Sequence, residues 1–239
     1  MTDNYHMSGV AAQFAANRVA KPPRSLCGLS ADILGVSATC VTLMNNQNSA
    51  PVCASDSRAG RLDDLQYTVG EGPSPEAFAE RSLVSEPDLA HQIPQRWRHF
   101  TPVAIELGMA SVFAFPLHVG DSCLGVLTAY QDVAGPLSKN QESDGLLVAD
   151  TIAKSMLRMR PEGDFEILAG TVGEGAHRAE FHQASGMIAV ALEIPVSEAA
   201  VRIRAHAFGA DRPVADVAGD IVAGRLRLDN DRPGSEFEV

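Results

Sequence analysis

The sequence lacks any long hydrophobic run: no window approaches the roughly 18 uninterrupted apolar residues that indicate a transmembrane helix. Residues Met1 to Met7 also lack a basic stretch followed by an apolar one, so we expect no secretory signal. From these two absences we expect a cytoplasmic protein with no membrane partner.

Motifs of metal binding and catalysis are also missing. The four cysteines, Cys27, Cys40, Cys53 and Cys123, form no Cys-x-x-Cys pair, and no histidines cluster near them at zinc spacing. There is no Walker-type phosphate loop and no Gly-x-Ser-x-Gly elbow. We therefore expect buried, reduced thiols, no metal, no cofactor and no enzymatic activity, with a redox or catalytic thiol as the alternative.

The charge of the chain argues against general binding of polyanions, because the net charge is −11. Residues 161–239 are the more acidic part, with 7 basic and 14 acidic residues. Positive charge is nevertheless concentrated between Val196 and Arg227, where five arginines face four carboxylates. Arginine both stacks on bases and forms paired hydrogen bonds to phosphate, so this segment is the candidate for nucleic-acid contact.

Apolar periodicity predicts an α+β fold with an antiparallel sheet over the first two thirds of the chain. Alternating and β-branched runs predict strands at 38–44, 51–55, 82–85, 111–119 and 124–131. Helical periodicity predicts helices at 10–19, 74–80, 97–107 and 140–160. Strand hairpins that do not alternate one for one with helices favour helices packed on an antiparallel sheet over a doubly wound sheet.

Strand signals stop after Pro161-Glu162-Gly163-Asp164, and three helices are predicted at 174–192, 198–208 and 213–223. In the first of them a heptad spacing links five residues: His177, Phe181, Ala184, Ile188 and Ala191. The predicted organisation is an N-terminal helix (1–24), an α+β domain (25–160), a linker (161–173), an all-α three-helix domain (174–228) and an acidic tail (229–239).

Three motifs in the last domain occur in a family-like order and spacing. They are Gln183-Ala184-Ser185-Gly186, the run from Ala199 through Ile203-Arg204 to Ala207, and Asp216-Val217-Ala218. This pattern resembles the ANTAR domain, a three-helix RNA-binding module of transcription antitermination regulators. One departure is Ser185, where the family often has lysine, so any phosphate contact made by that lysine is missing here.

The preceding domain resembles a GAF domain, a ligand-sensing α+β fold. The resemblance rests on Gly70-Glu71-Gly72-Pro73, on Ser85-Glu86-Pro87-Asp88-Leu89 and on the hairpin around Gly120. Similar sequences often have cysteine where this chain has Ser74. Together the two resemblances imply a GAF–ANTAR regulator that is a homodimer, with a possible small-molecule ligand in the GAF-like domain.

The resemblance and the residue types suggest two sets of functional residues. For RNA binding we select Ala199, Arg204, Ala207, Arg212 and Gly186, because small side chains allow close approach of a base and arginine supplies charge and a stacking plane. For a dimer seam we select Phe181, Ala184, Ile188, Ile152 and Met156. The structural alternatives are that the alanines and the seam residues are core, and that Gly186 allows close approach of another helix.

Three functions remain open from the sequence. The first is an antiterminator, in which a dimer binds paired stem-loops in leader RNA and blocks terminator formation. The second is a DNA-binding regulator, which Asp216 and Asp220 in the last helix disfavour, because a recognition helix should be polar and basic. The third is a GAF-like enzyme in which Cys53 and Cys123 act together on methionine sulfoxide.

Overall fold

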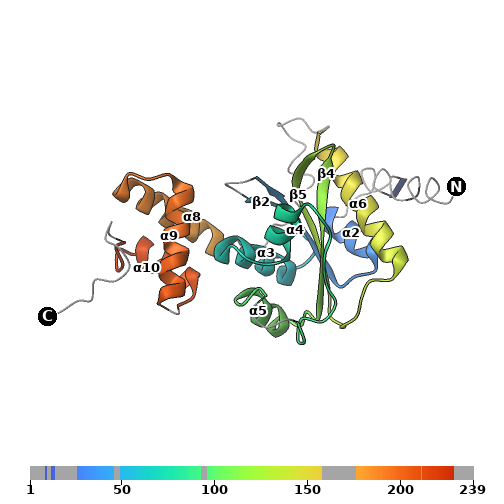
Figure 1. Cartoon of the computed structure of the whole chain (residues 1–239), viewed down its shortest axis with the longest axis horizontal. Coiled ribbons are helices and arrows are strands. Elements are labelled where there is room, and N and C mark those ends of the chain that lie inside the picture. Colours follow the sequence, from blue (N-terminus) through green and yellow to red (C-terminus); the bar gives the residue numbers. More distant parts are fainter. Residues whose placement is uncertain are drawn as a thin grey trace. The chain divides into compact units, whose positions relative to one another are not determined.

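The computed structural model divides the chain into two compact units, Met1–Gly175 and Ala176–Val239, each described by itself below (Figure 1). The structure describes residues 9, 12–13, 26–45, 49–92, 96–157, 176–210 and 212–228. The expected linker and tail lie outside the described residues, as does nearly all of the expected N-terminal helix.

The first unit is built on a five-stranded antiparallel sheet with the order β2-β1-β5-β4-β3. Its strands are β1 (Ala38–Met44), β2 (Ser49–Ala54), β3 (Val84–Glu86), β4 (Ser111–Val119) and β5 (Ser122–Gln131). Two hairpins, β1–β2 and β4–β5, meet where β1 pairs with β5. The prediction of an α+β fold with an antiparallel sheet is therefore confirmed.

Helices cover both faces of this sheet (Figure 1). One face carries α2 (Leu26–Leu34) and α6 (Lys139–Leu157), and the other carries α3 (Ser57–Val69), α4 (Pro73–Glu80) and α5 (Phe100–Glu106). Successive strand residues point to opposite faces, so Phe113 packs in the core beside α6 while Val112 packs in the core beside α5. Because both faces are buried, the strands are continuous apolar runs.

Helix α3 was not among the predicted helices, and Asp56 caps its start. The Asp56 carboxylate accepts a hydrogen bond of 2.9 Å from the backbone N–H of Ala59. The helix ends at Gly70, whose φ of 75° is the left-handed conformation that glycine adopts most easily. Pro73 then begins α4.

The described residues of the second unit form three helices, α8 (Ala176–Leu192), α9 (Val196–Gly209) and α10 (Val214–Val222). Pro195 occupies the N-cap of α9 and makes no side-chain capping bond. The three helices enclose one apolar core. Its fully buried members include Phe181, Ala184, Ile188, Ala199, Ile203, Ala207, Val214, Val217, Ala218 and Ile221.

Among the described helices, no single one is long and apolar enough to cross a membrane. One pair of segments, Glu180–Leu192 and Val196–Gly209, meets that length and composition test when taken together, but the two are bent by 107° at the break between them.

Candidate nucleic-acid interface

The outer side of α9 combines an arginine with an exposed aromatic ring. Arg204 and Phe208 are four residues apart, which places them one above the other on the same helix face. The guanidinium carbon of Arg204 lies 5.0 Å from the centre of the Phe181 ring, and Phe181 is completely buried in α8. This cation–π contact fixes the arginine beside the core. The Phe208 side chain remains 42% exposed.

Arg212 is held by an acidic neighbour. Its guanidinium donates a 2.5 Å hydrogen bond to Asp220, and Arg225 donates a 2.7 Å bond to the other oxygen of the same carboxylate. Hydrogen bonds from Arg212 and then from Arg225 lower the pKa of Asp220 below its ordinary value. The cluster of Arg212, Asp220 and Arg225 carries one net positive charge at the start and end of α10.

Burial corrects the prediction that Ala199 and Ala207 contact RNA. Both are completely buried, as is Ile203 between them, so the three form the inner face of α9. The spacing of four residues that suggested a shared face was right, but that face packs on the other two helices. Ala199 and Ala207 are therefore core residues in this arrangement, and the solvent side of α9 is the opposite one.

Gly186 lies in the middle of α8 with open space around it. A Cβ built on Gly186 would meet no atom within 4 Å. The alternative explanation, close approach of another helix of the same unit, is thus contradicted for the described residues. A half-exposed glycine in a helix interior costs about 1 kcal/mol relative to alanine, and no internal contact of Gly186 explains that cost.

Ser185, the departure noted in the first motif of the second unit, faces inward. It is 2% exposed, and its hydroxyl donates a 2.8 Å hydrogen bond to the backbone carbonyl of Phe181. The hydroxyl is therefore occupied within α8 and offers no contact to a ligand in this arrangement.

The predicted dimer seam is also corrected by burial. Phe181, Ala184 and Ile188 are inside the three-helix core, and Ile152 is inside the core between the sheet and α6, with Met156 packed against that core. Side chains that are already buried within one chain add no apolar area to a dimer interface. Three of the heptad residues, Phe181, Ala184 and Ile188, mark the inner face of a helix in a small bundle, whereas Ala191 is exposed.

Other apolar side chains, which the sequence analysis did not select, are exposed on the second unit. Val190 is 81% exposed and Met187 41% exposed on α8, and Val201 is 59% exposed on α9. Phe208 belongs to the same set. The signal that could have found them is the helical phase: each lies on the side opposite the buried residues of its helix.

A buried polar network lies on the α3–α4 side of the sheet in the first unit. The hydroxyls of Ser74 and Thr128 share a hydrogen bond of 2.7 Å, and the Gln66 side chain accepts 2.8 Å from the N–H of Ser74 and donates 3.2 Å to the Tyr130 hydroxyl. Cys40 completes it, 4.0 Å from the same hydroxyl. Burial, followed by the nearby Cys40 and Asp63, raises the pKa of Tyr130 well above its ordinary value.

This network fixes helices to the sheet. Gln66 belongs to α3, Ser74 to α4, and Thr128 and Tyr130 to β5, so the hydrogen bonds join three elements across the core. Ser74 takes the position where cysteine is frequent in similar sequences, and its hydroxyl has a buried partner there.

Trp97 belongs to the core on the α3–α5 side of the sheet. It is 5% exposed, its indole N–H donates 2.7 Å to Glu76, and the guanidinium of Arg96 lies 4.2 Å from the centre of its ring. Arg96 also pairs with Glu76 at 2.6 Å and with Glu86 at 3.0 Å. These contacts tie the segment before α5 to α4 and β3.

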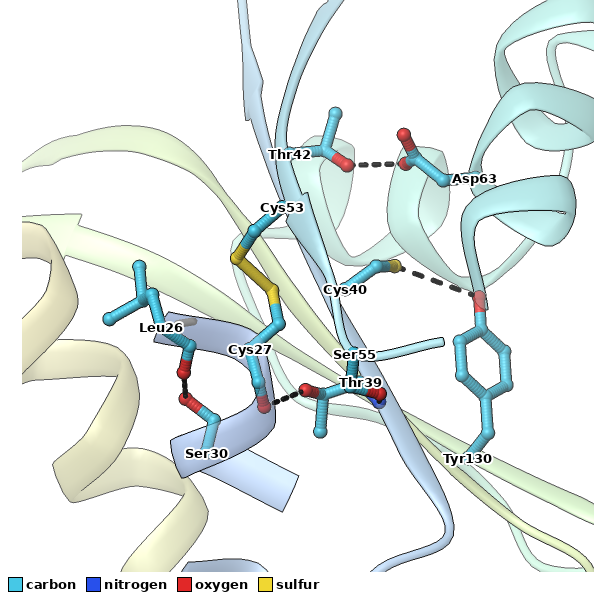
Figure 2. The surroundings of a disulfide bond; sticks show 10 residues. All are labelled: Leu26, Cys27, Ser30, Thr39, Cys40, Thr42, Cys53, Ser55, Asp63 and Tyr130. Carbon is cyan, nitrogen blue, oxygen red and sulfur yellow. Dashed lines mark hydrogen bonds between the residues drawn. A yellow bond between two sulfur atoms is a disulfide. The ribbon is translucent and has the colours of Figure 1, made fainter. Parts of the chain in front are cut away.

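The prediction of four reduced thiols is wrong for two of them. Cys27 and Cys53 form a disulfide, with Cα atoms 5.8 Å apart (Figure 2). Cys40 and Cys123 are not part of a disulfide. The pairing of Cys53 with Cys123, on which the enzyme hypothesis rested, does not occur, because Cys53 is bonded to Cys27. Within the described part of the chain, no three His, Cys, Asp or Glu side chains gather as a possible metal site.

Comparison with known proteins gives structural similarities only. No family model matches the sequence, and no curated protein matches it. The chain is similar to the GAF domain of a phosphoenolpyruvate-protein phosphotransferase from Coxiella burnetii, with 14% identity, a TM-score of 0.49, and coverage of 64% of this chain and 94% of that one.

Two further similarities are of the same order. A GAF domain region of a putative membrane protein from Geobacter sulfurreducens has 12% identity, a TM-score of 0.44, and coverage of 66% and 100% of the two chains. A type II free methionine-R-sulfoxide reductase from Thermoplasma acidophilum has 14% identity, a TM-score of 0.42, and coverage of 62% and 93%.

Proposed function

We propose that this chain is an RNA-binding transcription antitermination regulator, in which a GAF-type sensor unit controls an ANTAR-type three-helix unit. The proposal rests on the three motifs in the second unit and on one structural observation, the position of Arg204 and the exposed Phe208 one helical turn apart on α9. For the first unit the support is the antiparallel sheet with helices on both faces and the Gly-Glu-Gly-Pro run.

An exposed ring beside a guanidinium suits RNA loops better than a duplex. Unpaired bases in a loop stack on aromatic side chains and on arginine planes, whereas bases in a duplex present only their edges. Arg204 is oriented by the buried Phe181 ring, so part of the entropy of ordering its side chain is already lost before RNA binds. Arg212 lies beyond the end of α9, where its backbone N–H donates a 2.9 Å hydrogen bond to the Ala207 carbonyl and its guanidinium is paired with Asp220.

Because the charges within the second unit cancel, we expect RNA binding there to depend on a small number of directed contacts. Residues 176–228 contain six arginines and six carboxylates, so their net charge is zero. Arg202 is paired with Glu198, and Arg212 and Arg225 share Asp220. A diffuse attraction to phosphate is therefore small, and affinity must come from stacking and from a few oriented arginines.

A homodimer remains part of the proposal, because the expected target is a pair of stem-loops and each chain carries one Arg204–Phe208 pair. Two contacts made together gain affinity through effective concentration. The residues predicted for the dimer seam are buried within the cores of the two units. We therefore propose that exposed apolar residues of α8, Met187 and Val190, make the contact between chains. We propose no catalytic role for the chain, and a small-molecule ligand for the sensor unit remains an expectation from the resemblance.

The test is a titration of the full chain, at fixed salt, with an RNA that carries two adjacent hairpins with six-base loops and with duplex DNA of the same sequence. We expect binding to the RNA and much weaker binding to the DNA. Phe208→Ala should weaken RNA binding about 5- to 150-fold, the range that corresponds to 1–3 kcal/mol of base stacking. Arg204→Ala should weaken it by about tenfold or more.

The matched control is Arg202→Ala. Arg202 is on the same helix but on another side, paired with Glu198 at 2.9 Å, so its loss should change the RNA affinity by less than about threefold. If Arg202→Ala and Arg204→Ala weaken RNA binding equally, the interaction is a nonspecific attraction between charges. Tighter binding to DNA than to RNA would favour the hypothesis of a DNA-binding regulator over that of an antiterminator.

A further inference from the structure

The disulfide joins two elements at the margin of the sensor unit. Cys27 is the second residue of α2, and Cys53 lies in β2, which is an edge strand that pairs only with β1 among the described strands. Both cysteines are buried, at 0% and 2% exposure, in the core that α2 and α6 form with the sheet. Figure 2 shows the bond crossing from the first turn of α2 to β2.

The other two cysteines lie apart from this bond. Cys40 points to the opposite face of the sheet, where its sulfur is 4.0 Å from the Tyr130 hydroxyl. Cys123 is partly exposed in the β4–β5 hairpin, and its sulfur is 3.3 Å from the carbonyl oxygen of Gly125. The four cysteines thus comprise one pair in bonding geometry and two single thiols.

We infer that Cys27 and Cys53 are a reversible redox site of the sensor unit, reduced by thiols and reoxidised by hydrogen peroxide. A disulfide in a cytoplasmic protein, which is the expected location of this chain, is usually transient or redox-sensing rather than structural. The inference does not depend on what the second unit binds.

Each chemical step is balanced by a small reagent. In reduction, a thiolate attacks one sulfur of the bond, and the other sulfur leaves and takes up a proton. A second thiol then releases the first cysteine and forms the oxidised reagent disulfide. In reoxidation, one cysteine thiolate attacks an oxygen of hydrogen peroxide and becomes a sulfenic acid, with release of water. The second thiol displaces the sulfenic oxygen as a second water and re-forms the bond.

The position of the two sulfurs favours exchange without global unfolding. Local opening of an edge strand or of a helix end requires less free energy than opening the central strands β1 and β5.

The bond also controls how α2 is held. At the start of α2 the Thr39 hydroxyl donates a 2.7 Å hydrogen bond to the Cys27 carbonyl, beside the disulfide (Figure 2). At its end the Gln141 side chain, from α6, donates 3.0 Å to the Leu34 carbonyl. Reduction removes the covalent link and leaves hydrogen bonds and apolar contacts to hold the helix.

Consequently the redox state is transmitted to α6. Helix α2 shares a core with α6 and is bonded to it through Gln141, and α6 is the last described helix before the chain continues to the second unit. A looser α2 in the reduced state changes the support of α6, so the thiol–disulfide pair is placed to act as the input of the sensor unit.

The experiment uses the full chain in glutathione buffers of graded redox potential, followed by alkylation of free thiols and peptide mapping. Residues 27 and 53 should titrate together as one two-electron couple while the protein stays folded by far-UV circular dichroism, and peroxide should restore the bond. Reduction should speed amide exchange of α2 by about tenfold or more and leave α3 unchanged.

Matched variants separate this site from the other cysteines. Cys123→Ser should keep both the titration and the exchange response, whereas Cys53→Ser should lose both. The oxidised and reduced forms of the wild-type chain can be compared without any variant. This comparison therefore tests the reversible redox site even if Cys53→Ser fails to fold. A bond that resists every buffer until the protein unfolds, or a reduced pair that peroxide does not rejoin, would overturn the inference.

Discussion

Of the glycines inside helices, Gly145 in α6 and Gly186 in α8 should respond in opposite ways when each is replaced by alanine. A Cβ on Gly145 would lie 2.3 Å from Cζ of the Phe115 ring, whereas one on Gly186 would meet no atom within 4 Å. Contacts of a real Cβ below 3.0 Å are essentially never seen. Phe115 is completely buried in the sheet, so its ring has no free space into which to move.

The magnitudes follow from two opposing effects. Alanine in place of glycine favours a helix by about 1 kcal/mol, and overpacking a close contact costs about 1–3 kcal/mol or more. Gly186→Ala should therefore raise the free energy of unfolding of the second unit by about 1 kcal/mol. Because 2.3 Å is far below the 3.0 Å limit, Gly145→Ala should incur the upper end of the overpacking cost, about 3 kcal/mol, and lower the free energy of unfolding of the first unit by about 2 kcal/mol after the helix gain of about 1 is subtracted.

Urea unfolding measures both effects in one protein. The single tryptophan, Trp97, lies in the first unit and reports its unfolding by fluorescence, while amide exchange of α8 reports the second unit. A Gly145→Ala protein as stable as the wild type would refute the close contact with Phe115. A Gly186→Ala protein that is more stable but binds RNA less well would place Gly186 in the binding surface.

Three other predictions concern stability. Reducing the disulfide, which spans 26 residues, should lower the free energy of unfolding by about 3.5 kcal/mol in urea titrations, and Cys123→Ser should not. Phe181→Ala, in the core, should cost about 3–5 kcal/mol in unfolding of the second unit by circular dichroism, whereas the exposed Phe208→Ala should cost less than about 1. Because the pKa of Tyr130 is raised in the folded state, its stabilising effect is complete below the unfolded value of about 10 and is lost as the pH rises above it. Urea midpoints measured between about pH 9 and 11 should fall, and Tyr130→Phe should remove that dependence; a fall of equal size in the variant would contradict this assignment.

Local patterns in the sequence predicted the elements of the fold well. β-branched runs predicted β1 and β4 with their observed bounds, and helical periodicity predicted α8, α9 and α10 to within a few residues. Helix α3 was not among the predicted helices; its start depends on capping by Asp56, which a search for apolar periodicity does not detect.

The candidate site was predicted less well, because periodicity locates a face but not its neighbour. Ala199, Ile203 and Ala207 share one side of α9 as predicted, yet only the packing of α8 and α10 shows that this side is the inner one. For the same reason the heptad residues of α8 were taken as a seam between chains. Phe208 became a candidate only when its exposure was known.

The sequence by itself determined which segments are helices and strands, that two units follow each other, and which motifs resemble a sensor and an RNA-binding module, since these depend on neighbours along the chain. The tertiary structure decided what depends on distant segments. It brought Cys27 within bonding distance of Cys53, and it set Arg204 over Phe181. It also turned Ala199 inward and Phe208 outward, because a side chain is buried or exposed only with respect to elements that pack against it.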